Sequence, residues 1–180
     1  MIQFQKSIEE YTIFYYNDDR KLWVEKHCES KEVVMKTAIV YYSKHHGNTK
    51  KLLDAIAAKE EVVLIDVTEQ TTADLSAYDR IGFASGIYYG SFAKQLVTFA
   101  KQNLPSGKKV FFLNTCGSER GSYFDSIRGV AKEKQCVEIG AYQCLGFDTF
   151  GPFKLVGGIA KGHPTQAELD GAVAFYRSLP

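Results

Sequence analysis

Residues Tyr41–Lys51 join an apolar run to a helix-forming stretch through a short polar loop. The loop contains Ser43, Lys44, His45, His46, Gly47, Asn48 and Thr49. A helix that begins at its end presents unpaired N–H groups and the positive end of its dipole. The side chains add hydroxyl, amide and imidazole donors, and a glycine lets a bound group approach the backbone. The loop is therefore a candidate site for an anion such as a phosphate.

The residue types narrow the kind of phosphate that this loop would bind. It has neither the G-x-x-x-x-G-K-[ST] pattern of nucleotide triphosphate loops nor the G-x-G-x-x-G pattern of dinucleotide sites. Hydroxyl, amide and imidazole donors favour a phosphomonoester held without magnesium. The alternative is that Asn48 or Thr49 simply caps the following helix. The loop alone leaves both interpretations open.

A second loop places two tyrosines between two glycines, directly after a predicted strand. It contains Ser85, Gly86, Ile87, Tyr88, Tyr89, Gly90 and Ser91. Glycines permit unusual backbone angles and leave peptide groups open to a ligand. Aromatic faces stack on flat partners. We expect Tyr88 or Tyr89 to lie against a planar ring, the alternative being that both pack on the edge of the sheet.

A third polar loop spans residues 114–122 and includes Thr115, Cys116 and Gly117. Cys116 and Arg120 are too close in sequence for the C-x5-R arrangement of phosphatases. A redox-reactive thiol at Cys116 stays open, since the sequence alone does not set its pKa. One phosphate loop, one aromatic slot and one small polar loop together suit a flat ring with a phosphate tail.

Alternating strands and helices from Lys36 onward must position these loops. Apolar runs predict strands at residues 37–42, 62–67, 81–84, 110–113 and 137–144. Helical spacing predicts helices at residues 49–59, after an N-cap at Ser91, around residues 124–131, and after a capping box at residues 165–168. This alternation predicts an α/β fold with a parallel sheet covered on both faces. Ligands in such sheets bind beyond the carboxyl ends of the strands, where the three loops fall.

Residues 1–34 differ from the rest of the chain. Residues 11–16 form a β-like run, Asp18-Asp19 is a turn signal, and residues 22–24 could return antiparallel. A hairpin packed on the main domain and a poorly ordered extension are both compatible with this pattern. Either way, residues 35–180 are expected to form the binding domain.

Composition excludes several classes of protein. The chain has 180 residues, 45% of them hydrophobic and 24% charged, which fits an ordinary globular domain. A net charge of +1 without a basic stripe argues against a nucleic-acid partner.

No apolar run approaches the roughly 18 residues of a membrane span, and the charged residues near the start do not resemble a secretory signal. A cytoplasmic location is expected. Neither the four cysteines nor the histidines have metal-site spacing, so no metal is expected.

The three loops together resemble those of the flavodoxin family. The pattern Ser43-x-x-x-Gly47-x-Thr49 is one residue longer than the common flavodoxin form and is similar to that of menaquinone-dependent protoporphyrinogen oxidases, as is the stretch from Ser85 to Gly90. The glycine-rich segments at residues 146–152, 157–158 and 162–164 resemble small bacterial flavodoxin-like proteins. The resemblance covers residues 36–179. It implies a flavodoxin-like three-layer sandwich, a five-stranded parallel sheet of order 2-1-3-4-5, and flavin mononucleotide (FMN) as cofactor.

The resemblance also implies roles for residues of this chain. The loop from Ser43 to Thr49 would bind the phosphate, residues from Ser85 to Gly90 would line the flavin ring, and Thr115 to Gly117 would close its pyrimidine side. The scarcity of acids in these loops would raise the flavin potential. The function implied is electron transfer through non-covalently bound FMN, to a partner protein or a small molecule.

Two other functions stay open. One is an FMN-dependent oxidoreductase acting on a quinone or a porphyrinogen. The near-neutral charge favours it somewhat, because electron-carrying flavodoxins are strongly acidic. The other is a non-redox signalling module of the same fold, which would need an aspartate where this chain has Ser85. A homodimer is compatible with the sequence.

Overall fold

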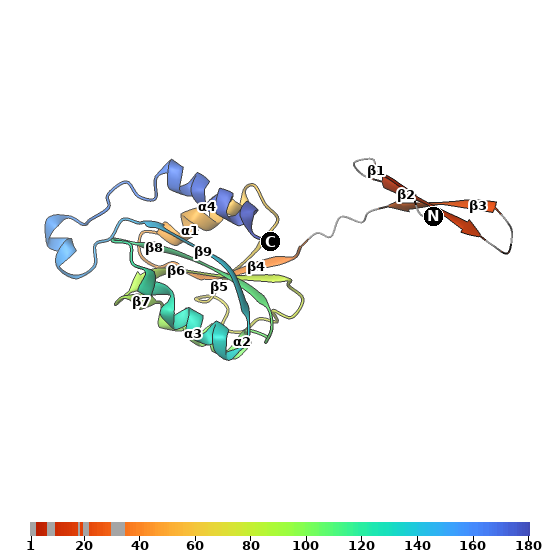
Figure 1. The fold of residues 1–180 in the computed structure, drawn as a ribbon. Helices are drawn as coiled ribbons and strands as arrows, with labels where there is room; N and C mark the ends of the chain where they lie inside the picture. The colour runs from red at the N-terminus through yellow and green to blue at the C-terminus, as the bar shows by residue number, and fades with distance from the viewer. Residues whose placement is uncertain (1–2, 7–9, 18, 20–21, 30–34) are drawn as a thin grey trace. The chain divides into compact units, whose positions relative to one another are not determined.

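The computed structural model describes residues 3–6, 10–17, 19, 22–29 and 35–180, and the chain divides into two compact units, residues 1–34 and 35–180 (Figure 1). In the first unit, β1 (Gln3–Lys6), β2 (Glu10–Asn17) and β3 (Leu22–Glu29) form an antiparallel sheet in that order. Asp18 of the expected turn lies outside the described residues. Packing of this segment on the main domain stays a prediction.

The second unit is built on a parallel sheet. Its strands are β4 (Thr37–Tyr42), β5 (Val63–Asp66), β6 (Arg80–Tyr88), β8 (Lys109–Cys116) and β9 (Val137–Leu145). They pair in parallel in the order β5-β4-β6-β8-β9. This is the order 2-1-3-4-5 within the unit, so the predicted topology is confirmed. A two-residue strand, β7 (Ser91–Phe92), pairs antiparallel with β6.

Helices cover both faces of this sheet (Figure 1). α1 (Asn48–Ala57) and α4 (Gln166–Ser178) lie on one face, and α2 (Lys94–Asn103) and α3 (Asp125–Glu133) lie on the other. Two short 3-10 helices, η1 (Gly121–Phe124) and η2 (Gly151–Val156), lie in the connections. The predicted three-layer α/β sandwich is confirmed.

Burial of β4 shows why the sequence predicts this architecture. Every residue of β4 is buried. Val40 belongs to the apolar cluster under α2 and α3, whereas its neighbour Ile39 belongs to the cluster under α1 and α4. A strand that packs against helices on both faces has to be apolar throughout, because successive side chains point to opposite faces.

The structure corrects the prediction at the start of the second helix. Ser91 is not an N-cap: it lies in β7, and its hydroxyl donates to the hydroxyl of Ser126. α2 begins later, at Lys94, after Ala93, which has no side-chain cap. The predicted capping box at α4 is confirmed, because Thr165 and Glu168 exchange both hydrogen bonds.

The second loop is also shorter than expected, because β6 continues to Tyr88. Tyr89 and Gly90 form the two-residue turn of a hairpin to β7, with φ of 53° and 79°. Positive φ at both turn residues matches the right-handed twist of the flanking strands. The chain thus turns sharply between the two tyrosines.

Among the described helices, none combines the length and apolarity needed to cross a membrane.

Candidate functional site

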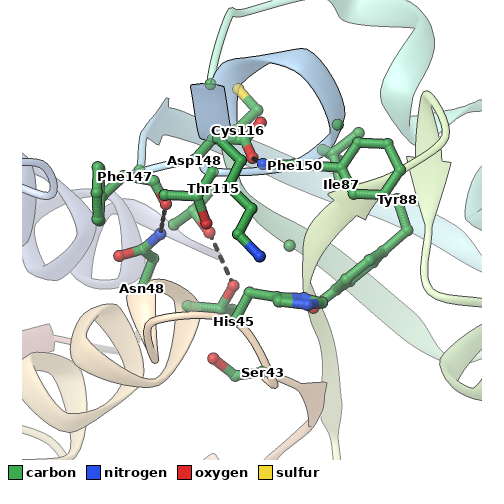
Figure 2. Close-up of a pocket in the computed structure, with 17 residues that line it drawn as sticks. Ser43, His45, Asn48, Ile87, Tyr88, Thr115, Cys116, Phe147, Asp148 and Phe150 are labelled. Carbon is green, nitrogen blue, oxygen red and sulfur yellow. Dashed lines mark hydrogen bonds between the residues drawn. The ribbon is translucent and has the colours of Figure 1, made fainter. Parts of the chain in front are cut away.

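A cavity of about 290 Å³ lies at the carboxyl ends of β4, β6, β8 and β9 (Figure 2). Four connections converge on it: the loop before α1, the end of β6, the end of β8 and the segment after β9. Its lining residues are Ser43, His45, Asn48, Thr49, Gly86, Ile87, Tyr88, Thr115, Cys116, Gly117, Gly146, Phe147, Asp148, Thr149, Phe150, Gly151 and Lys154. The three loops singled out from the sequence therefore meet in one place.

The first turn of α1 forms one wall of this cavity. The residue before the helix, Gly47, is left-handed with φ of 65° and provides no side-chain cap. Ser43 Oγ accepts a hydrogen bond of 3.1 Å from the backbone N–H of Lys50. The N–H groups of Asn48 and Thr49 have no protein acceptor within residues 35–180. These donors, together with the helix dipole, favour an anion at this position.

Neither Asn48 nor Thr49 caps α1 through its side chain, so that alternative is wrong. The Asn48 amide nitrogen donates instead to the carbonyl oxygen of Phe147 over 2.8 Å, as Figure 2 shows. Asn48 Oδ1 is the one buried side-chain oxygen or nitrogen in the described part of the chain without a partner. A Cβ on Gly146 would lie 2.9 Å from the Asn48 amide nitrogen, so this contact requires glycine.

The two adjacent tyrosines have different surroundings. Tyr88 lines the cavity, and its ring packs edge-on against Tyr42 at 5.4 Å and tilted against His45 at 5.6 Å. Burial raises the pKa of its hydroxyl, so Tyr88 is neutral at physiological pH. Tyr89 is 89% exposed and contacts Phe150, with ring centroids 5.0 Å apart. Only Tyr88 is in position to contact a molecule inside the cavity.

Cys116 is buried at the end of β8. Burial raises the pKa of its thiol from 9.0 to about 12, and its Sγ donates to the carbonyl oxygen of Cys144. Because the thiolate is the nucleophilic form, this burial disfavours reaction of the thiol at neutral pH. The alternative of a redox-reactive cysteine does not fit the structure.

Six predicted site residues do not line the cavity: Lys44, His46, Gly47, Ser85, Tyr89 and Gly90. His46 nevertheless contacts its wall, through a 2.9 Å hydrogen bond between Nε2 and Thr149 Oγ1. Ser85 is fully buried, and its hydroxyl accepts from the backbone N–H of Ala93, which anchors the residues before α2. Its role is structural. Gly90 lies outside the cavity, in the hairpin turn.

The segment after β9 forms a further wall of the cavity, which the sequence patterns did not predict. It contributes Gly146 to Gly151 and Lys154. Phe147 N–H donates to the carbonyl of His163, and Asp148 exchanges two backbone hydrogen bonds with Ile159. These bonds fold the segment back over the site. It adds the only full charges to the lining, one from Asp148 and one from Lys154. The one available signal was its likeness to bacterial flavodoxin-like proteins, which gave no roles.

Comparison with known proteins identifies the family. Residues 39–135, more than half of the chain, match the flavodoxin domain family. The chain is also 33% identical over 147 residues to an uncharacterised protein of Methanocaldococcus jannaschii, a match covering 81% of this chain and 98% of the relative. This protein belongs to the flavodoxin family.

Solved structures of flavodoxins have the same fold. The two-electron-reduced flavodoxin of Megasphaera elsdenii matches with a TM-score of 0.52 and 18% identity, over 76% of this chain and 98% of its own. Oxidised flavodoxin 2 of Bacillus cereus matches with a TM-score of 0.53 and 18% identity, over 77% of this chain and 94% of its own.

Within the described residues, no group of three or more His, Cys, Asp or Glu side chains is arranged to hold a metal ion.

Proposed function

We propose that this flavodoxin-family protein binds FMN non-covalently in the cavity and transfers electrons through it. The observation that carries the proposal is that the unpaired N–H groups of Asn48 and Thr49, an aromatic side chain and a polar loop converge on one cavity. A phosphate suits the helix start, and a flat ring suits the half-buried ring of Tyr88, which packs beside His45.

The residues present fit FMN chemically. At the phosphate end, the N–H groups of Asn48 and Thr49 and the Thr49 hydroxyl would donate to the phosphate oxygens. His46 lies at the rim, where its Nε2 is hydrogen-bonded to Thr149 Oγ1.

At the ring end, Tyr88 would lie against the flavin, and the peptide groups of Gly86 and Ile87 would face its edge. Ala84 to Gly86 pair with β8, so this stretch of backbone is held firmly. Thr115, Cys116 and Gly117 would close the pyrimidine side. The flavin would supply the redox chemistry, whereas the chain binds it, orients it and excludes water.

Charge near the ring would set how easily the flavin accepts electrons. The cavity lining has one carboxylate, Asp148, and one ammonium group, Lys154. A negative charge on reduced flavin is disfavoured by acids and favoured by cations. We therefore propose a potential above that of acidic flavodoxins, with Lys154 opposing the effect of Asp148.

An FMN-dependent oxidoreductase acting on a quinone or a porphyrinogen is the second candidate. The observation that favours it is a groove beside the cavity, large enough for a small molecule and sharing two side chains with it. The net charge of +1 points the same way, since it gives little electrostatic steering towards a basic partner protein.

An absorption spectrum of the chain with added FMN, followed through stepwise reduction, tests both candidates. Perturbed flavin bands and a stable one-electron state are expected for an electron carrier. Direct two-electron reduction, especially by NAD(P)H, is expected for the oxidoreductase. A spectrum identical to that of free FMN would overturn the proposal of flavin binding.

A further inference from the structure

A groove of about 630 Å³ lies beside the candidate cavity, along β7 and α2. It shares His45 and Tyr88 with the cavity, and these two rings, 5.6 Å apart, form a wall common to both. The groove is lined by Tyr42, His45, Tyr88, Tyr89, Ser91, Phe92, Ala93, Lys94, Gln95, Val97, Thr98, Lys101 and Ser126. Its volume falls in the range of roughly 300–1,000 Å³ typical of small-molecule sites.

The charged side chains that line this groove are all positive. Lys94 and Lys101 line it, and none of its lining residues is an aspartate or a glutamate. Neither lysine takes part in an ion pair within the described residues. The whole of α2 lacks acidic residues as well. The two ammonium groups are therefore uncompensated, which favours an anionic ligand.

The spacing of the lysines and the nature of the other walls limit the ligand further. Lys94 and Lys101 are seven positions apart on one face of α2, so they are separated by about 10.5 Å along the helix axis. Tyr88, which is half-buried, provides an aromatic wall, whereas Tyr42 and Phe92 also line the groove but are themselves almost fully buried. Aromatic rings favour stacked or edge-on contact with other flat rings. The groove thus combines an aromatic end with a cationic flank.

We propose that this groove is a second ligand site, for a small planar aromatic molecule that carries an anionic group. Lys94 and Lys101 bind the anionic group, and the aromatic part packs against Tyr88. The proposal of this site goes beyond the proposed function and depends on FMN binding in one respect only. When FMN occupies the cavity, the shared wall of His45 and Tyr88 separates it from a ligand in the groove.

Two matched probes test this site, 2-naphthalenesulfonate and its neutral analogue 2-naphthalenesulfonamide. Isothermal titration of the FMN-loaded chain at low salt is expected to give at least roughly fivefold tighter binding for the sulfonate, with loss of this preference at high salt. Flavin absorbance recorded during the titration should show that FMN stays bound. Equal affinities for the two probes would overturn the proposal, as would displacement of FMN by the sulfonate.

Three single substitutions locate the site. Lys94→Gln and Lys101→Gln should each weaken sulfonate binding by roughly threefold to tenfold and leave the sulfonamide unaffected. Lys132→Gln, on the exposed side of α3 and outside the groove, should change neither. Unchanged sulfonate affinity in both α2 variants would contradict the assignment. If FMN fails to bind, the proposed function fails, but the same titrations on the chain without FMN still decide whether the groove exists as a site.

Discussion

The hydroxyl oxygens of Thr49 and Thr115 lie 2.9 Å apart and are buried together. Thr49 belongs to the first turn of α1 and Thr115 to the end of β8. This hydrogen bond therefore joins a helix and a strand through residues that are 66 positions apart in the sequence. Both side chains line the cavity. The phosphate end and the polar side of the proposed flavin site are therefore held together by one contact.

Replacing Thr49 with valine should weaken FMN binding, because valine keeps the shape of threonine but loses the hydroxyl. We expect a loss of ~1–3 kcal/mol, or roughly fivefold to 150-fold in Kd, by fluorescence titration. Riboflavin, which lacks the phosphate, should lose less. Thr72→Val, at an exposed position outside the cavity, is the matched control and should leave both affinities unchanged. Equal losses for FMN and riboflavin would show that Thr49 does not contact the phosphate.

The two tyrosines of the β6–β7 hairpin should give opposite results. Tyr88→Leu should alter the absorption bands of bound FMN and weaken binding by roughly threefold to tenfold, since an aromatic contact is worth ~0.5–1.5 kcal/mol beyond its area. Tyr89→Leu should leave the spectrum and the affinity unchanged, because that side chain is 89% exposed and outside the cavity. An effect from Tyr89 alone would mean that the hairpin closes over the ligand in another way.

Two glycine substitutions should shift stability in opposite directions. Gly146→Ala would bring a Cβ within 2.9 Å of the Asn48 amide nitrogen and disturb its bond to Phe147, so it should lower the free energy of unfolding and weaken FMN binding. Gly129→Ala, in α3 with no atom near the added Cβ, should stabilise the chain by about 0.5–1 kcal/mol. Urea unfolding measures both. A neutral Gly146→Ala variant would contradict the close packing of Asn48.

Stability should fall at alkaline pH. Burial raises the pKa of Cys116 and of Cys144 from 9.0 to about 12, so the folded chain holds these protons more tightly than the unfolded chain. The resulting stabilisation is complete below about pH 9 and is lost as pH rises from 9 to 12. Tyr41, with its pKa also raised to about 12 by burial, adds to the same loss at the upper end.

Urea unfolding at about pH 8 and about pH 11 checks this dependence. Cys144→Ala removes one titrating group that does not line the cavity, so the difference between the two pH values should shrink in that variant. A free energy of unfolding that is constant over this range would show that the thiols are accessible to water in the folded chain.

Much of the fold follows from local sequence patterns. Ile39 and Val40 are apolar neighbours because helices cover both faces of β4, and Thr165 and Glu168 form their capping box within one helical turn. Such signals lie within a few residues of one another. The topological order of the strands came instead from the resemblance to flavodoxins.

The features of the fold and the cavity that the sequence patterns did not predict depend on contacts with residues distant in the sequence. Serine is a common N-cap residue, but Ser91 pairs with Tyr88 across the hairpin and hydrogen-bonds to Ser126. These two contacts keep it out of the helix. The wall at residues 146–151 has no periodicity, because contacts with His163 and Ile159 set its position. The sequence alone could not show which of Tyr88 and Tyr89 lines the cavity, because the hairpin turn that begins after Tyr88 decides it.

The affinities of the chain for FMN and for riboflavin, measured side by side by fluorescence titration, test the central claim most directly. The two ligands share the ring and the ribityl chain and differ in the phosphate. The proposed site predicts that both bind and that FMN binds at least roughly tenfold more tightly, through the N–H groups at the start of α1 and the Thr49 hydroxyl. Equal affinities, or no binding of FMN, would contradict a phosphate site at this helix.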